Sequence, residues 1–191
     1  MAGNDRETID RLVRQAQNGD RAAFSQLVRR TMRDITALTY RMTGDRDAAQ
    51  DLAQETFVSA WQHLSGFRRE ARFENWLYRI AANKALNYLG RGGAGRTVSL
   101  EDAGGAGAER ASDEPAPDRA LEQARLRDDI SAFMRLLPPR QRLVFELRFY
   151  RQLGFAEIAE MTGTAVGTVK TNYREAVGKL RTYAAERGWR P

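Results

Sequence analysis

The residues best suited to reading nucleic acid lie in the segment 155–174, FAEIAEMTGTAVGTVKTNYR. Ile158 and Ala159 supply the inner face of a short first helix, and Gly163 follows where a tight turn needs a residue without Cβ strain. The apolar residues of a second helix recur at spacings of three and four, at Val166, Val169, Tyr173, Val177 and Leu180. This pattern predicts a helix-turn-helix whose second helix enters a DNA major groove.

The polar residues of that second helix carry the chemistry for such a contact. Lys170, Thr171 and Arg174 fall largely off the apolar face, and Lys or Arg paired with guanine is the commonest direct contact. Thr164 and Thr168, with nearby backbone amides, are suited to holding phosphates. The alternative is an ordinary pair of core helices. The joint placement of Ala, Gly and Val at constrained positions favours the DNA-reading interpretation.

A second group of basic and polar residues lies between Gly66 and Arg91. Arginine neutralises phosphates, and a pocket holds an unstacked base by stacking and by hydrogen bonds to its edge. A loop with arginines precedes a helix with amides and one lysine: Arg68, Arg69 and Arg72, then Asn75, Asn83, Lys84 and Asn87.

Aromatic residues are interleaved with this group, at Phe67, Phe73, Trp76, Tyr78 and Tyr88. Such side chains either stack on bases or pack in a core, and core packing is the commoner role. Phe67 and Trp76 are therefore not assigned to the predicted site.

Composition limits the classes of protein that remain. The 191 residues carry a net charge of +6 with an isoelectric point of about 10.0, which favours a polyanionic partner. No cysteine is present, which excludes disulfides, thiol catalysis and zinc–thiolate sites. No apolar run approaches the roughly 20 residues that span a bilayer, and the polar N-terminus lacks a signal-peptide segment. We therefore expect a cytoplasmic protein that is not inserted in a membrane.

The elements that position these residues are predicted to be all α-helical. Helical stripes fill residues 1–90 and 121–191, and no alternation of period two persists long enough for a strand. The segment 91–120 is rich in glycine and poor in apolar residues, so we expect a flexible linker between two small domains.

Capping residues predict where several helices begin and end. Asp20 is expected to begin a long helix that ends at Gly44, and Asp45 or Asp47 to begin the next, which Gly66 stops. Helices are also expected at residues 74–89 and 140–150, the latter with Leu143, Val144 and Leu147 buried. A stripe of Leu126, Ile130, Phe133, Met134 and Leu137 is expected to end at the two prolines that follow.

Three segments in this order resemble the extracytoplasmic-function (ECF) family of bacterial sigma factors. They are DAAQDLAQETFVSAW (47–61), FRREARFENWLYRIAANKALNYL (67–89) and LPPRQRLVFELRFYRQLGFAEIAEMTGTAVGTVKTNYREA (137–176). The resemblance covers nearly the whole chain. It implies a region 2 helical bundle at 1–90 and a region 4 helix-turn-helix at 121–191, with the linker at 91–120.

The resemblance also implies partners and roles. Such a protein binds core RNA polymerase, through the β′ clamp and the β subunit, and promoter DNA. It takes no cofactor and no small-molecule substrate, and an anti-sigma factor commonly holds it inactive. Residue types alone favour a solvated helix at 47–64, whereas the family places polymerase docking there, on Asp51, Gln54, Glu55, Trp61 and Gln62.

For DNA, the resemblance assigns the two groups of residues to the two promoter elements. The −10 set is Arg68, Arg69, Arg72, Glu74, Asn83, Lys84 and Asn87, and the −35 set is Thr164, Thr168, Lys170, Thr171 and Arg174. The chain departs from the family's usual pattern after GTVK, where it has Thr171, Asn172 and then Glu175. Either the −35 sequence differs from the common one or Glu175 faces a partner protein.

Two other classes of function compete with this interpretation. His63 is the only histidine and has no plausible nucleophile around it, so the sequence gives an enzyme little support. A stand-alone helix-turn-helix regulator would account for residues 137–181 but not for 47–89.

Overall fold

The computed structural model describes residues 2–91 and 129–188. Within these ranges every regular element is a helix, as predicted. The helices are α1 (Ala2–Gln17), α2 (Arg21–Thr43), α3 (Arg46–His63), the 3-10 turn η1 (Leu64–Gly66), α4 (Phe73–Gly90), a helical stretch at 129–136, α6 (Pro139–Phe149), α7 (Phe155–Thr162) and α8 (Val166–Glu186). Apart from Arg91, the predicted linker lies outside the described residues, as do Leu121 and Leu126.

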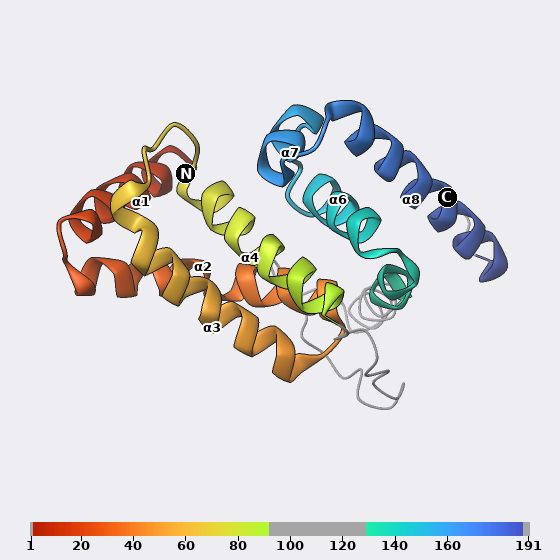
Figure 1. The fold of residues 1–191 in the computed structure, drawn as a ribbon, viewed down its shortest axis with the longest axis horizontal. Helices are drawn as coiled ribbons and strands as arrows, with labels where there is room; N and C mark the ends of the chain where they lie inside the picture. Colours follow the sequence, from red (N-terminus) through yellow and green to blue (C-terminus); the bar gives the residue numbers. More distant parts are fainter. Residues whose placement is uncertain (1, 92–128, 189–191) are drawn as a thin grey trace, which may run out of the picture.

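Helices α1 to α4 form a bundle in which α2 packs against the other three (Figure 1). We call this group the N-terminal lobe. The predicted stripes of α1 and α2 are its core, and Leu12, Leu27, Ile35 and Leu38 are fully buried. These long apolar faces, rather than helix propensity alone, stabilise the bundle.

Two of the predicted helix boundaries of this lobe are confirmed at atomic detail. The Asp20 carboxylate accepts hydrogen bonds from the amides of Ala22 and Ala23, at 2.8 and 3.0 Å, and so caps α2. Asp45, rather than Asp47, caps α3 by accepting from the Ala48 amide. Gly66 was predicted to end the helix that Asp45 begins. In the structure that helix, α3, ends at His63, and Gly66 ends the 3-10 turn η1 that follows it.

The residues 129–136, α6, α7 and α8 form the C-terminal lobe. Phe133, Met134 and Leu137 are buried against Phe145 of α6 and Tyr183 of α8, as the stripe predicted. The Phe133 ring lies edge-on to Phe145, with centroids 5.7 Å apart. The expected burial of Leu143, Val144 and Leu147 on α6 is also confirmed.

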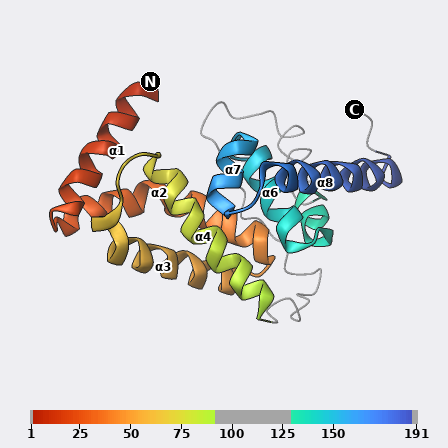
Figure 2. The same cartoon turned by 45° about the horizontal axis from the view of Figure 1, so that its top comes forward.

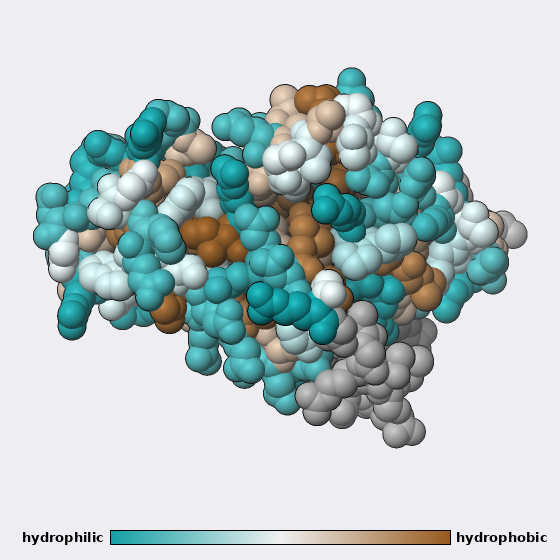
Figure 3. Space-filling view, in the orientation of Figure 1, coloured by the Kyte–Doolittle hydropathy of each residue, from teal (hydrophilic) through white to brown (hydrophobic). Residues whose placement is uncertain are grey.

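The two lobes pack directly against each other (Figure 2). One hydrophobic cluster contains residues of both lobes, with Leu143 and Leu147 of α6 beside the core residues of α2 and α4. We call this contact the seam. Hydrophobic residues reach the surface along it, on a face that is otherwise mostly hydrophilic (Figure 3). Local sequence patterns predict two lobes but not this contact between them.

Substitution by alanine at two glycines is expected to change the stability of the protein in opposite directions. Gly44 ends α2 at φ 72°, in the left-handed region, and an added Cβ would lie 2.9 Å from Arg135 Cδ. Gly178 lies inside α8 with nothing within 4 Å of an added Cβ. We expect Gly44→Ala to lower the unfolding free energy by about 1–2 kcal/mol and Gly178→Ala to raise it by about 0.5–1 kcal/mol. Urea denaturation measures both, and a loss of stability in Gly178→Ala would contradict the assignment.

Candidate nucleic-acid interface

Residues 155–174 fold as the predicted helix-turn-helix, formed by α7 and the first half of α8. Helix α7 packs on α8, and Ile158, Ala159 and Val169 are buried between them and the shared core. Gly163 has φ 64°, as the predicted turn requires. The amide of the next residue, Thr164, donates to the Ala159 carbonyl at 3.0 Å and closes the turn.

The first half of α8 presents the predicted DNA-reading residues to solvent. Thr168, Lys170, Thr171 and Arg174 are all exposed. Ala165 makes no side-chain cap, so no side chain of that residue competes with a phosphate for the first amides of α8. Thr164 differs from the others, since it is half-buried and its hydroxyl bonds with that of Thr162 at 2.8 Å.

One residue of this helix lies opposite to its predicted position. Val166 was assigned to the apolar inner face, but 39% of its surface is exposed. The rest of the predicted face is confirmed, since Val169 is buried and Tyr173, Val177 and Leu180 pack partly buried against the core, beside Ala176 and Tyr183. The inner face of the helix therefore begins one turn later than predicted. Val166 lies on the same exposed surface as the predicted DNA-reading residues, and its apolar side chain could contact a thymine methyl group.

Glu175, the departure from the family pattern, is bonded within its own lobe. Its carboxylate accepts a hydrogen bond from the Gln141 side-chain amide of α6, and the Gln141 carbonyl oxygen accepts from Lys179 at 2.9 Å. The two explanations predicted for the presence of Glu175 are a different −35 sequence and a contact with a partner protein. The structure adds a third role for Glu175, which is to join α8 to α6.

The arginine loop lies between η1 and α4 and is fixed from α1. The side-chain amide of Gln17 donates to the carbonyls of Leu64 and Phe67, at 3.0 and 2.8 Å. Arg68, Arg69 and Arg72 all remain exposed beyond this anchor. Arg69 has φ 60°, a conformation that costs free energy in any residue with a Cβ and often marks a functional loop.

A cavity of about 790 Å³ lies beside this loop. Its walls come from α1, the loop, the start of α4 and α7, and they combine arginines and carboxylates with the rings of Phe67 and Trp76. The residues that line it include Arg14, Arg68, Arg69, Arg72, Glu74 and Trp76. The size lies within the range of small-molecule sites. The arginines of the lining suit a base with its phosphate, whereas Glu157 and Glu160 of α7 oppose one.

Helix α4 continues this surface with a row of polar side chains. Arg79, Asn83 and Asn87 are exposed and follow one another at intervals of four, so they share one face. Sequence reasoning missed Arg79, although its spacing from Asn83 was the available signal. Lys84 is turned toward α3, where its ammonium group lies 3.1 Å from the Glu55 carboxylate.

The aromatic residues here pack against one another, and Phe67 and Trp76 also line the cavity. The rings of Phe67 and Trp76 lie 4.9 Å apart and both contact Phe73. Tyr78 is 6% exposed, with its hydroxyl donating to the Asp34 carboxylate at 3.3 Å and Arg151 over its ring at 4.3 Å. Burial raises the pKa of Tyr78, with Asp34 adding to the effect against the opposing charge of Arg151.

This raised pKa predicts a loss of stability in alkali. An unfolded tyrosine ionises near pH 10, so the contribution of Tyr78 is complete below that pH and is lost as the pH rises toward its folded pKa. We expect the unfolding free energy to fall by up to about 1.4 kcal/mol per pH unit above pH 10 for this group. Urea midpoints between pH 9 and 11 measure the slope. An equally steep slope in Tyr78→Phe would show that this tyrosine is not its source.

Helix α3 presents the residues predicted to bind a protein. Asp51, Gln54, Glu55 and Gln62 are exposed on it, whereas Trp61 is half-buried against Phe24, with ring centroids 4.9 Å apart. Val58 lies in the same row, at the helical spacing, and 58% of its surface is exposed. An apolar side chain amid polar ones is typical of a protein interface, and the sequence reasoning did not include it.

Other kinds of site find no support in the described residues. None of their helices is long and apolar enough to cross a membrane. The same residues hold no group of three or more His, Cys, Asp or Glu side chains that would bind a metal ion.

Comparison with known proteins gives matches over most of the chain. The family models for sigma-70 region 2 and sigma-70 region 4 match residues 27–94 and 127–180. The RNA polymerase sigma-H factor of Pseudomonas aeruginosa is 37% identical, over 91% of this chain and 93% of the relative. The ECF RNA polymerase sigma factor SigW of Bacillus subtilis is 32% identical, over 91% and 95%. The solved structure of CnrH in complex with the cytosolic domain of CnrY aligns with a TM-score of 0.65 at 26% identity, covering 94% of this chain and 98% of CnrH.

Proposed function

Because this chain belongs to the ECF family of RNA polymerase sigma factors, we propose a division of its surface among core polymerase and two promoter elements. As a sigma factor it directs promoter-specific initiation of transcription, and sigma factors are not enzymes. The match of residues 27–94 to region 2 excludes the stand-alone regulator, which had no use for that part of the chain.

The −35 element is assigned to the exposed start of α8. Thr168 and the free amides of that helix hold phosphates, while Lys170, Thr171 and Arg174 read base edges. Thr164 contributes by fixing the turn, since its amide and hydroxyl are both bonded within the chain.

The −10 element is assigned to the arginine loop, its cavity and the polar row of α4. Arg68, Arg69, Arg72 and Glu74 surround a base that has left the stack, and Asn83 and Asn87 follow the strand along α4. Lys84 links this surface to α3 through its pair with Glu55. The observation that supports this assignment best is the cavity, because Arg68, Arg69, Arg72 and Glu74 all line it.

Core polymerase is assigned to α3, through Asp51, Gln54, Glu55, Trp61 and Gln62, with the β′ clamp as the partner surface. The β subunit is the second surface of the polymerase that the chain is expected to contact. Val58 adds an apolar centre to this polar face. The chain is expected to act in the cytoplasm, beside the polymerase.

An anti-sigma factor is the expected regulator. Membership of the family supports this expectation. The similar protein CnrH, which was solved in complex with the cytosolic domain of CnrY, supports it as well. The chain's own surfaces for polymerase are the expected target of such a partner.

Run-off transcription with purified core polymerase over a library of promoters tests the proposal. The expected result is specific initiation that depends on this chain and defines both promoter elements. The isolated chain should bind duplex DNA weakly and lose this binding steeply with salt. A sharp footprint by the isolated chain, with no specificity conferred on the polymerase, would contradict the function.

A further inference from the structure

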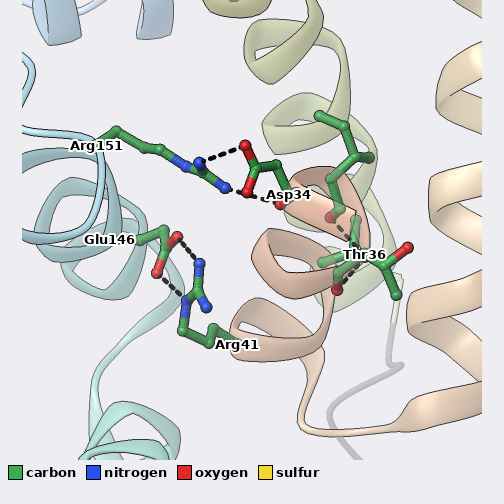
Figure 4. A network of polar contacts seen from close by, with 7 residues as sticks. Asp34, Thr36, Arg41, Glu146 and Arg151 are labelled. Carbon is green, nitrogen blue, oxygen red and sulfur yellow. Dashed lines mark hydrogen bonds and ion pairs between the residues drawn. The ribbon is translucent and has the colours of Figure 1, made fainter. Parts of the chain in front are cut away.

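The seam holds an ion pair that is almost removed from water (Figure 4). Arg41 of α2 donates two hydrogen bonds to Glu146 of α6, from Nε and Nη2, both at 2.6 Å. The Glu146 side chain is 0% exposed and that of Arg41 is 13% exposed. Burial acts to lower the pKa of Arg41, but the Glu146 carboxylate more than offsets this, so the pKa is raised.

Two further arginines of the C-terminal lobe reach the same half of α2. Arg151 lies 3.2 Å from the Asp34 carboxylate and donates to the Asp34 carbonyl at 2.8 Å (Figure 4). Arg142 donates to the carbonyl of Met42, at the negative end of the α2 dipole. The seam is therefore specific as well as apolar, since Arg41, Arg142 and Arg151 each have a partner across it.

A buried charge is costly when its partner leaves, whereas the intact pair is close to neutral in free energy. Separation of the lobes returns Glu146 and Arg41 to water together, so the apolar contacts of the seam, rather than this pair, supply the net stability of the closed state. The effect of the pair is to make the packed arrangement unique, because a shifted seam would leave either charge buried and unpaired. The chain thus has one well-defined closed state.

The closed state does not fit the two promoter elements together. Elements at −10 and −35 are about 25 base pairs apart, which is about 85 Å of duplex at about 3.4 Å per base pair. Helix α7 contacts both α4 and α8. With neighbouring helix axes about 8–10 Å apart, α4 and α8 are separated by only about 20 Å. One DNA element at most is engaged until the lobes separate.

The chain between the lobes is long enough for such a separation. Residues 92–128 lie between them in sequence. Fully extended, this number of residues spans about 120 Å, at about 3.3 Å per residue.

The closed state also covers one DNA surface with carboxylates. Glu157 and Glu160 of α7 line the cavity that contains the loop residues Arg68, Arg69 and Arg72. Negative groups at that wall oppose the approach of a phosphate chain to the same arginines. Separation of the lobes removes α7 from the cavity.

We propose that the free chain is autoinhibited by closure of its lobes in one arrangement, which an interlobe latch of Arg41 with Glu146 and Asp34 with Arg151 specifies. In this arrangement the −10 surface and the −35 surface lie on one closed body until the lobes separate on the polymerase. This inference rests on the proposed function, because it concerns the regulation of the same two DNA surfaces.

Energy transfer between two dyes measures the latch directly. The chain has no cysteine, so dyes on Asn18→Cys and Thr182→Cys report the distance between the lobes. We expect Glu146→Gln to reduce energy transfer in the free chain, because closure of the lobes would then bury the Arg41 charge without its partner. We also expect it to raise affinity for a forked promoter with both elements by about tenfold or more, since two linked contacts then form together. Glu186→Gln removes the same charge from an exposed site of the same lobe and should change affinity less than twofold.

Asp34→Asn provides a second variant, on the more exposed pair, with circular dichroism to confirm that each variant is folded. Unchanged energy transfer in both folded latch variants would overturn the proposal. Separated lobes without a gain in DNA affinity would overturn it as well. If instead the wild-type chain gave no promoter-specific transcription with core polymerase, the proposed function would fail, whatever the dyes report.

Discussion

Replacement of Lys170 and Arg174 by alanine is expected to lower transcription from promoters with a −35 element by about 100-fold, because each good base contact contributes about 1–3 kcal/mol. Both side chains are exposed at the start of α8, so the fold should be unaffected. Binding to core polymerase should also remain unchanged. Run-off transcription, together with polymerase affinity measured by fluorescence anisotropy, separates the two properties.

Two cations farther along α8 provide the matched control. Lys179→Ala with Arg181→Ala removes the same charge, from exposed positions beyond the proposed reading surface. Equal losses in the two double variants would mean that net charge, rather than base reading, explains the effect. A parallel loss of polymerase binding in the Lys170 and Arg174 variant would point to misfolding.

The second large effect is expected on α3. Asp51→Ala with Glu55→Ala should weaken binding to core polymerase by about 100-fold or more, as the loss of two central interface groups commonly does. Every promoter should be affected alike, because the loss precedes recognition of DNA. Both carboxylates are exposed, so the unfolding midpoint should hardly move. Polymerase affinity and transcription from several unrelated promoters measure this result.

The pair between Glu55 and Lys84 requires its own control. Loss of Glu55 also frees the Lys84 ammonium group, which is proposed to lie near the −10 strand. Lys84→Ala alone breaks the same pair but leaves the α3 carboxylates in place. If Lys84→Ala weakened polymerase binding as much as the double variant, the effect would come from the broken pair and α3 would not be the docking surface.

The helices of this chain were predictable because their causes are local. Asp20 caps α2, Gly44 takes the left-handed conformation that ends it, and Gly163 does the same in the turn before α8. Each depends on residues within one or two turns of the chain. The exposure of Lys170 and Arg174 likewise follows from helical spacing against a buried Val169.

The parts that sequence reasoning missed depend on distant contacts. Glu146 is a charged residue within an apolar stripe, and only Arg41, 105 residues away, explains its complete burial. The exposure of Val166 depends on how α7 crosses α8, which spacing alone does not determine. Val58 was missed because an apolar residue on a helix is usually assigned to the core, whereas its exposure requires knowledge of which side of α3 has a neighbour.

The hydrogen bonds of Gln17 have a practical consequence for anyone who trims this protein. The match to region 2 begins at residue 27, so a fragment cut at that boundary would lack Gln17 and all of α1. The carbonyls of Leu64 and Phe67 would then lose the hydrogen bonds from the Gln17 amide. The cavity beside the arginine loop would lose the wall that α1 provides. A fragment shortened in this way would report on a loosened arginine loop rather than the native one, and the boundary for recombinant work belongs before α1.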